Sequence, residues 1–169
     1  MPITFEVEVD FEETNFTDAL GVHIVEFGLG FDTDDNLIPT MSVMLVPGAE
    51  FAGEEFENAF DLQFGIRTRN AASSYKISAP DFSVEIVNKY IKGADRPLVL
   101  DCVCRAIRIL VNNVDPTEIT MRTFYKDLKG KPLKKYDNIV STLEECGLIL
   151  KDFFKDDNGH HYWFFSKKD

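Results

Sequence analysis

The chain of 169 residues is 44% hydrophobic and 12% aromatic and carries a formal net charge of −11 at pH 7. This composition excludes a disordered chain, and the length suits one domain or two small domains that share a core. The sequence contains three cysteines, no apolar run long enough to cross a bilayer and no signal-peptide pattern at its acidic start, so we expect a cytoplasmic protein without a membrane anchor.

Period-two alternation of apolar and polar residues predicts an antiparallel β-meander in the first part of the chain. The predicted strands cover residues 3–12, 20–31, 37–46, 60–68 and 72–78. A turn at 32–36 and an acidic loop at 47–59 separate them. Pro39 indicates that the third strand lies near the edge of the sheet or starts late, because proline cannot donate a hydrogen bond to a neighbouring strand.

The charges are divided unevenly along the chain. Residues 1–66 contain 15 Asp and Glu and no Lys or Arg, whereas residues 67–169 contain 18 Lys and Arg against 14 Asp and Glu. A surface with one sign of charge repels itself, so the acidic part indicates either a cationic partner or a purely solubilising role.

The acidic side chains of the first part form the predicted partner-binding face. On the strand at 3–12 the carboxylates recur at every second residue, about 6.6–6.8 Å apart, which is also about two axial phosphate steps of a DNA strand. Such a row could imitate a nucleic-acid backbone or bind a basic groove of a protein, as bacteriophage counter-defence and immunity proteins of similar charge and size do. The residues are Glu6, Glu8, Asp10, Glu12, Asp32, Asp34, Asp35, Glu54, Glu55 and Glu57.

The second part has a helical period of 3.6 residues. Helices are predicted at 80–92, 97–113 and 132–146, with a short helix capped by Asp115 and Pro116 that runs to about Tyr125. The residues 93–97 are the predicted boundary, so the chain divides into an acidic β domain at 1–93 and a helical domain at 97–169, which pack separately or as one unit.

The chain closes with strands at 148–155 and 160–166 around an Asn158-Gly159 turn. The stretch DNIVSTLEECGLILKDFFKDDNGHHYWFF, in which a helix stopped by glycine leads into a hairpin, resembles the recognition helix and wing of winged-helix domains. The resemblance implies a winged-helix-like unit that binds DNA or another protein. The aromatic residues of the hairpin indicate either a covered core or a surface for a homodimer.

A lysine-rich segment at 126–142 is the alternative binding site, for nucleic acid. Cationic side chains supply most of the affinity for phosphate, and a recognition helix would place polar side chains in the major groove. Against this, the predicted wing tip is acidic. The residues are Lys126, Lys129, Lys131, Lys134, Lys135, Asn138 and Thr142.

No residue pattern predicts catalysis, a metal site or a cofactor. Asp32, Asp34 and Asn36 match the first ligands of a calcium loop, but Leu37 and Val43 stand where that loop needs Gly and Glu. The sequence therefore predicts an α+β fold, with a non-enzymatic regulator or inhibitor that docks its acidic face on a basic protein as the leading function. A DNA-binding winged-helix regulator is one alternative, and a small enzyme without a recognisable motif is another.

Overall fold

The structure is a computed structural model that describes residues 15–18, 20–32, 34–48, 50–51, 54–55, 58–70, 84–91, 93–122 and 133–168. The strands in this part of the chain are β1 (Asn15–Thr17), β2 (His23–Gly28), β3 (Leu37–Pro47), β4 (Glu50–Phe51), β5 (Glu54–Glu55), β6 (Ala59–Asn70), β7 (Glu118–Arg122), β8 (Leu148–Lys155) and β9 (His161–Lys167). The helices are α1 (Val84–Tyr90), the 3-10 turn η2 (Gly93–Asp95), α2 (Arg96–Val114) and α3 (Leu133–Glu145). The predicted strands at 3–12 and 72–78 lie outside the described residues.

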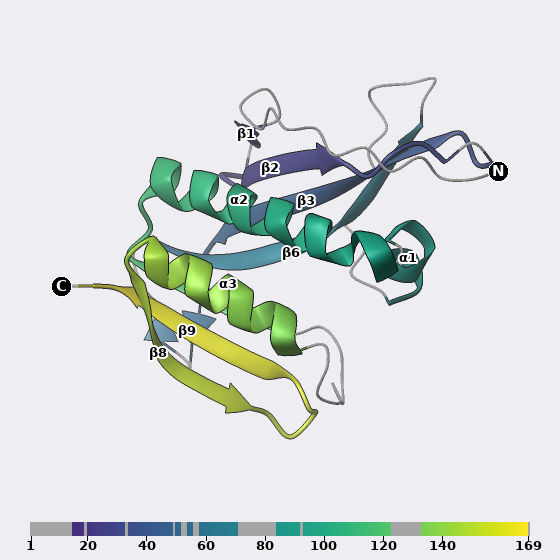
Figure 1. Ribbon diagram of the computed structural model, residues 1–169. Helices are drawn as coiled ribbons and strands as arrows, with labels where there is room; N and C mark the ends of the chain where they lie inside the picture. Colours follow the sequence, from purple (N-terminus) through teal and green to yellow (C-terminus); the bar gives the residue numbers. More distant parts are fainter. Residues whose placement is uncertain are drawn as a thin grey trace.

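Within the described residues, one seven-stranded sheet in the order β1-β2-β3-β6-β7-β9-β8 spans the molecule (Figure 1). Strands β6 and β7 run parallel, and their neighbours in the sheet pair antiparallel. Strands β4 and β5 form a separate two-stranded ribbon. The predicted α+β fold class is confirmed.

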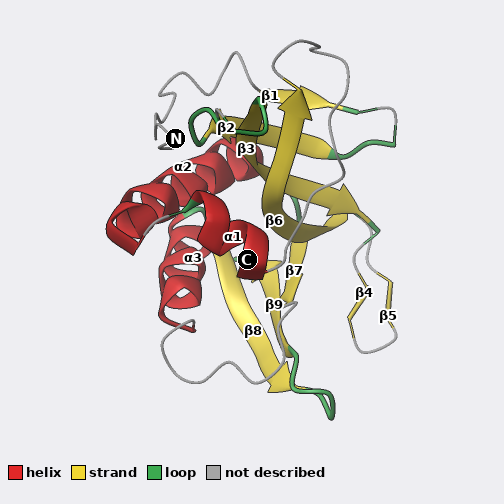
Figure 2. Ribbon diagram, turned by 90° about the vertical axis from the view of Figure 1, so that its right-hand side faces the viewer, coloured by secondary structure: helices red, strands yellow, loops and turns green. Residues whose placement is uncertain are grey.

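The helices α1, α2 and α3 lie on the same face of the sheet (Figure 2). Helix α2 packs against β2 and β3, and α3 packs against β8 and against α2. Alternation on the strands points one set of apolar side chains at these helices, which explains why the core forms as a single layer between sheet and helices. Its fully buried members include Val25, Phe27, Val43, Leu45, Ile107, Leu110, Ile119 and Phe165.

The predicted short helix after Asp115 is wrong, because residues 118–122 form the strand β7. Asp115 adopts a left-handed conformation with φ of 51° and ends α2 instead of starting a new helix. Ile119 and Met121 are buried, and β7 pairs with β6 on one side and β9 on the other. Tertiary pairing on both edges outweighs the local helix signal, and one sheet therefore runs through both predicted domains.

Pro39 lies in the interior of the sheet, so the predicted edge position of its strand is wrong. Strand β3 is paired with β2 and β6, and it begins at Leu37. The carbonyl of Pro39 accepts a hydrogen bond from the amide of Leu29 at 2.9 Å. In an antiparallel pair the N–H and C=O of one residue point to the same side. Pro39 therefore lacks a donor opposite Leu29, one residue after β2 ends at Gly28, so no hydrogen bond within β2 is lost.

The predicted helix and hairpin at the C-terminus are confirmed as α3, β8 and β9. Their register differs from that of a two-residue turn, because Phe153 lies opposite Trp163 and Phe154 opposite Tyr162. The Asp156 carboxylate accepts hydrogen bonds from the amides of Asn158 and His160, both at 2.9 Å, and so organises a longer turn. Since β9 also pairs with β7, the hairpin extends the main sheet.

Candidate functional site

The parallel strands β6 and β7 part from each other inside the sheet. Their paired register runs from Ala59 opposite Glu118 to Leu62 opposite Met121. Strand β7 ends at Arg122, whereas β6 continues to Asn70 with β3 as its partner. The carboxyl ends of the two parallel strands therefore diverge beneath the helices, which is where open sheets with parallel strands commonly bind ligands.

A cavity of about 580 Å³ lies at this divergence. Its volume falls in the range of small-molecule sites, which is about 300–1,000 Å³. Strand β6 forms its floor, and the end of β7, α1, η2, the start of α2 and the start of α3 form its walls. The lining includes Met41, Leu62, Phe64, Ile66, Val87, Ile91, Gly93, Arg96, Val99, Val103, Arg122, Lys135, Tyr136, Asn138 and Ile139.

The floor of the cavity is apolar because of alternation on β6. Leu62, Phe64 and Ile66 are two residues apart, so their side chains share the face that the helices cover. Val99 and Val103, one helical turn apart on α2, meet them from above. The inner part of the cavity therefore favours an apolar group.

Three basic residues contribute to the lining, from three different elements. Arg96 comes from the start of α2, Arg122 from the end of β7 and Lys135 from the first turn of α3. Arg96 also donates a hydrogen bond to the side-chain oxygen of Asn88 at 2.7 Å, which fixes its position between α2 and α1. Three basic residues thus lie around one cavity, in a protein whose formal net charge is −11.

Lys135 is the most perturbed of these cations. Its ammonium lies 5.7 Å from the ring centre of Phe64 and 5.0 Å from that of Tyr136. Burial, and secondarily the positive charge of Arg96, lower the pKa of Lys135 below its ordinary value. Lysines with a lowered pKa inside a cavity are typical of functional sites, because they reach the neutral, reactive form closer to physiological pH.

Aromatic stacking fixes the wall that carries Lys135. The ring of Tyr136 stacks on that of Trp163, with centres 4.7 Å apart and planes at 18°, and its centre lies 6.4 Å from that of Phe64. Tyr136 and Trp163 are buried. Because these rings pack α3 against both β6 and β9, they hold the start of α3 in place over the cavity.

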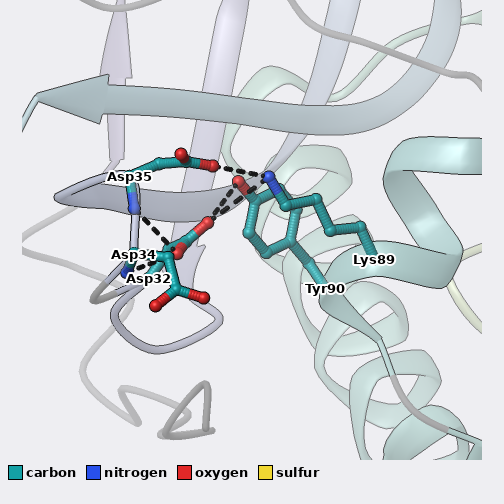
Figure 3. Close-up of polar contacts among 5 residues, drawn as sticks. All are labelled: Asp32, Asp34, Asp35, Lys89 and Tyr90. Atoms are coloured by element: carbon teal, nitrogen blue, oxygen red, sulfur yellow. Dashed lines mark hydrogen bonds and ion pairs between the residues drawn. The ribbon is translucent and has the colours of Figure 1, made fainter. Parts of the chain in front are cut away.

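A polar cluster holds the opposite wall, α1, against the turn between β2 and β3 (Figure 3). Tyr90 donates a hydrogen bond to the buried carboxylate of Asp32 at 3.1 Å, and Lys89 forms an ion pair with Asp35 at 2.8 Å. The other oxygen of Asp32 accepts hydrogen bonds from the amides of Asp34 and Asp35. The cluster positions Val87 and Ile91 on the cavity wall.

The electrostatics of this cluster keep Asp32 ionised. Burial alone would raise its pKa, but the amides of Asp35 and Asp34, the Tyr90 hydroxyl and the charge of Lys89 together outweigh burial and lower the pKa. The hydrogen bond that Lys89 donates to Asp35 raises the pKa of Lys89. Burial and the hydrogen bond to Asp32 raise the pKa of Tyr90.

Only part of the predicted acidic face lies within the described residues. Asp32 is 3% exposed and therefore buried, whereas Asp35 is exposed and paired with Lys89 at 2.8 Å. Asp34 is exposed. Residues Glu6, Glu8, Asp10, Glu12 and Glu57, and the side chains of Glu54 and Glu55, lie outside the described residues.

The predicted lysine-rich segment also lies only partly within the described residues. Thr142 is 3% exposed and its hydroxyl donates to the carbonyl of Asn138 at 2.8 Å, so its expected place on an exposed reading face is wrong. Lys135 turns into the cavity, and Asn138 is exposed beside it. Lys126, Lys129, Lys131 and the side chain of Lys134 lie outside the described residues, so nucleic-acid binding by this segment stays a prediction.

Sequence reasoning missed the cavity itself. The boundary segment at 93–97 supplies Gly93, Arg96 and Pro97 to the lining, and Arg122 was assigned to a helix that does not form. Lysine 135 was singled out, but as a contact to nucleic acid. A signal was present in its neighbours, since a lysine followed by Tyr136 on the apolar stripe of a helix places its stem against the core.

Comparisons with known proteins identify no family for this chain. No family model matches it, and no curated protein matches it. Among solved structures, a mutant of spermidine N-acetyltransferase SpeG from Vibrio cholerae is similar, with 13% sequence identity and a TM-score of 0.33. The alignment covers 84% of this chain and 63% of that chain.

The acetyltransferase corrects the leading functional expectation. It is an enzyme, which contradicts the predicted non-enzymatic regulator or inhibitor, and that expectation is wrong. The alternative of a small enzyme without a recognisable motif agrees better with the comparison. At a TM-score of 0.33 the likeness assigns neither a reaction nor a substrate, so both have to be argued from the cavity.

Proposed function

We propose that the chain is a small enzyme that acts, in the cavity at the β6–β7 divergence, on an anionic small molecule with an apolar portion. The observation that carries the proposal is Lys135, a lysine of lowered pKa on the wall of an apolar cavity of about 580 Å³. A cavity of this size admits a small molecule and excludes a folded partner.

The charge of the ligand follows from the lining. Arg96, Arg122 and Lys135 line one cavity, and the charge of Arg96 disfavours the charged form of Lys135. An anionic group of the ligand would offset the charge of Arg96, and a guanidinium binds a carboxylate or phosphate through two parallel hydrogen bonds. Arg96 is therefore assigned to binding and orienting the anion.

The apolar portion of the ligand would occupy the floor. Leu62, Phe64 and Ile66 on β6 and Val99 and Val103 on α2 surround it. Each buried CH₂ group of a ligand contributes about 0.8 kcal/mol to binding. Lys135 lines the same cavity with its amine beside Phe64, and a lysine of lowered pKa there would act as a general base towards the ligand.

Equilibrium binding of para-methylbenzoate tests this assignment, with neutral para-methylbenzamide as the reference. We expect Arg96→Gln to weaken the benzoate about tenfold, or about 1.4 kcal/mol, with little change for the benzamide. The control is Arg108→Gln, also from α2, because Arg108 binds Glu145 at 3.2 Å and does not line the cavity. An equal loss in the control would mean that the benzoate binds to surface charge in general, and the assignment would fail.

Proton uptake supplies a second readout of the same binding event. An anion beside Lys135 raises its pKa, so binding in the pH range where Lys135 titrates should be accompanied by uptake of protons, measured by calorimetry in buffers of different ionisation enthalpy. Lys135→Met should abolish the uptake. Binding of the benzoate without any uptake in the wild-type protein would show that the anion does not lie beside Lys135.

A further inference from the structure

We propose that the ligands of the cavity are unbranched aliphatic carboxylates, which bind with the carboxylate at Arg96 and the hydrocarbon tail inward, and that Val103 limits the length of the tail. This inference rests on the proposed function, since it concerns the same cavity. It adds the class of ligand, the direction in which the ligand enters and a residue that determines specificity.

The lining of the cavity changes along α2 from an exposed basic residue to buried aliphatic residues. Arg96, at the start of α2, is exposed, whereas Val99 and Val103 are 5% and 4% exposed. The three residues follow at spacings of three and four, so they share one face of the helix, and all three line the cavity. A ligand with one charged end and one apolar end therefore has one favourable direction, because burying the charged end without a partner would be costly.

The inner end of the cavity is closed where α2 and α3 come together. The sulfur of Cys104 lies 4.0 Å from the carbonyl oxygen of Asn138, and one turn further along α2 Arg108 binds Glu145 at 3.2 Å. Among the described residues, Val103 is the last of α2 that lines the cavity. A tail that enters past Arg96 therefore ends at Val103.

The separation of Arg96 and Val103 sets the expected length of the tail. Val103 lies seven residues after Arg96 on α2, which corresponds to a rise of about 10 Å. An extended octanoate has a comparable length. Each CH₂ group up to octanoate should therefore find apolar surface inside the cavity, and longer chains should find no more.

The aromatic rings of the lining are already in use, which favours an aliphatic tail over an aromatic one. Tyr136 stacks on Trp163 with ring centres 4.7 Å apart, and the ammonium of Lys135 lies 5.7 Å from the ring centre of Phe64 and 5.0 Å from that of Tyr136. An aromatic ligand gains its additional energy by stacking on a ring face. An alkyl chain needs only apolar surface, which the branched side chains of β6 and α2 provide.

The first experiment measures the affinity of the wild-type protein for straight-chain carboxylates from butyrate to dodecanoate, by calorimetry below their micelle concentrations. We expect the affinity to rise about fourfold for each CH₂ group up to about octanoate, and then to level off. A rise that continues through dodecanoate would mean adsorption to exposed apolar side chains such as Leu98 and Phe153, and would overturn the proposal.

Val103→Ala tests the residue that limits the tail. The smaller side chain should extend the rise, so that decanoate binds about fourfold more tightly than to the wild type, while butyrate is unchanged. Val111→Ala is the matched control, because Val111 is equally buried on α2, at 5% exposed, and lies outside the lining. An equal gain for decanoate in both variants would show that a loosened core admits the longer chain and that Val103 does not set the limit.

Arg96→Gln tests the direction of binding. If the carboxylate lies at Arg96, the substitution removes the same contact from every ligand, and butyrate and octanoate should weaken by the same factor, about tenfold. A loss confined to the long chains would place the tail, and not the carboxylate, beside Arg96, and the proposed direction would be wrong.

A matched pair of probes separates this inference from the proposed function. Octanoate and para-methylbenzoate have the same number of carbon atoms and the same charge. If para-methylbenzoate binds with the Arg96 dependence given above and octanoate binds no more tightly, the aliphatic class is overturned and the proposed function stands. If neither binds with a dependence on Arg96, the proposed function fails, and this inference fails with it. The wild-type series needs no variant, so a poorly folded mutant cannot obscure its result.

Discussion

The dipeptide Lys-Tyr occurs on two helices of this protein and has opposite properties in each. Lys89 precedes Tyr90 on α1, and Lys135 precedes Tyr136 on α3, with each ammonium about 5 Å from the ring centre of the following tyrosine, at 5.1 and 5.0 Å. Asp35 raises the pKa of the first lysine, whereas burial and Arg96 lower that of the second. The same local sequence therefore gives a structural ion pair in one place and a lysine of lowered pKa on a cavity wall in the other.

The difference is set by residues distant in the sequence. The partners of Lys89 come from the β2–β3 turn, more than fifty positions earlier, and those of Lys135 come from β6 and α2. Both lysines nevertheless serve one cavity, because α1 and α3 form two of its walls. On α1, the ion pair between Lys89 and Asp35 holds a wall of the cavity in place. On α3, burial and the like charge of Arg96 lower the pKa of Lys135.

The strongest way to break the α1 site is to remove its buried charge. Asp32→Asn leaves Tyr90 and two backbone amides with a neutral acceptor and should lower the free energy of unfolding by about 1–3 kcal/mol. Asp157→Asn, at the exposed turn between β8 and β9, is the matched control and should change it by less than about 0.5 kcal/mol. Urea denaturation of both variants at pH 7 measures the difference.

The same pair of variants has a defined dependence on pH. Because the folded pKa of Asp32 is lowered, its stabilising contribution is present above the ordinary pKa near 3.8 and is lost as the pH falls through the lower, folded value. The gap between wild type and Asp32→Asn should therefore be widest near neutral pH and close in acid. A gap that persists unchanged at pH 2 would mean that the charge of Asp32 contributes nothing.

Replacing each lysine by methionine should change the stability by a smaller amount, and in opposite directions for the two lysines. Lys89→Met loses the ion pair with Asp35 and should lower stability, whereas Lys135→Met removes a partly buried charge and should raise stability by about 1 kcal/mol or less at pH 7. Because the folded pKa of Lys135 is lowered, the cost of its charge disappears as the pH rises towards 10.5, and the advantage of methionine should fade there. Equal signs for the two variants in thermal unfolding at pH 7 would remove the distinction between the sites.

The smallest expected changes are in the pKa values themselves. Asp35→Asn should lower the pKa of Lys89 and leave Lys135 unchanged, and Arg96→Gln should raise the pKa of Lys135. Titration of the two lysine side chains by NMR would resolve both. If Arg96→Gln leaves Lys135 where it was, burial accounts for the shift by itself, and the anion would have less repulsion to relieve.

The elements of period two or 3.6 could be predicted from the sequence, and the divergence that makes the cavity could not. Strand β3 and helix α2 have patterns long enough to identify, and their bounds differ from the predicted ones by at most one residue at each end. Strand β7 has five residues after a strong Asp-Pro helix signal, and only its pairing with β6 and β9 makes it a strand. Because of that pairing, Arg122 lies in the same cavity lining as Lys135, so the site was beyond local reasoning.

The burial of one acidic residue in the β2–β3 turn also could not be predicted from the sequence. Asp32, Asp34 and Asp35 resemble a solvated turn, and in sequence they are indistinguishable from the other carboxylates of the first part. One of the three is 3% exposed and holds α1 in place through Tyr90. A count of charges gives the net charge of a segment but not which carboxylate is buried. The burial of Asp32 depends on its hydrogen bond with Tyr90, which lies 58 residues further along the chain.

The short strand β7 also determines how the molecule can be divided. A cut near residues 93–97, which composition suggests as a linker, would leave β6 with an open edge on one fragment and β7 with an open edge on the other. Each edge would offer unpaired backbone groups to other chains, so the separated halves would be prone to aggregate and to seek each other. Five residues in the middle of the sheet thus make the two sequence halves dependent on being synthesised as one chain.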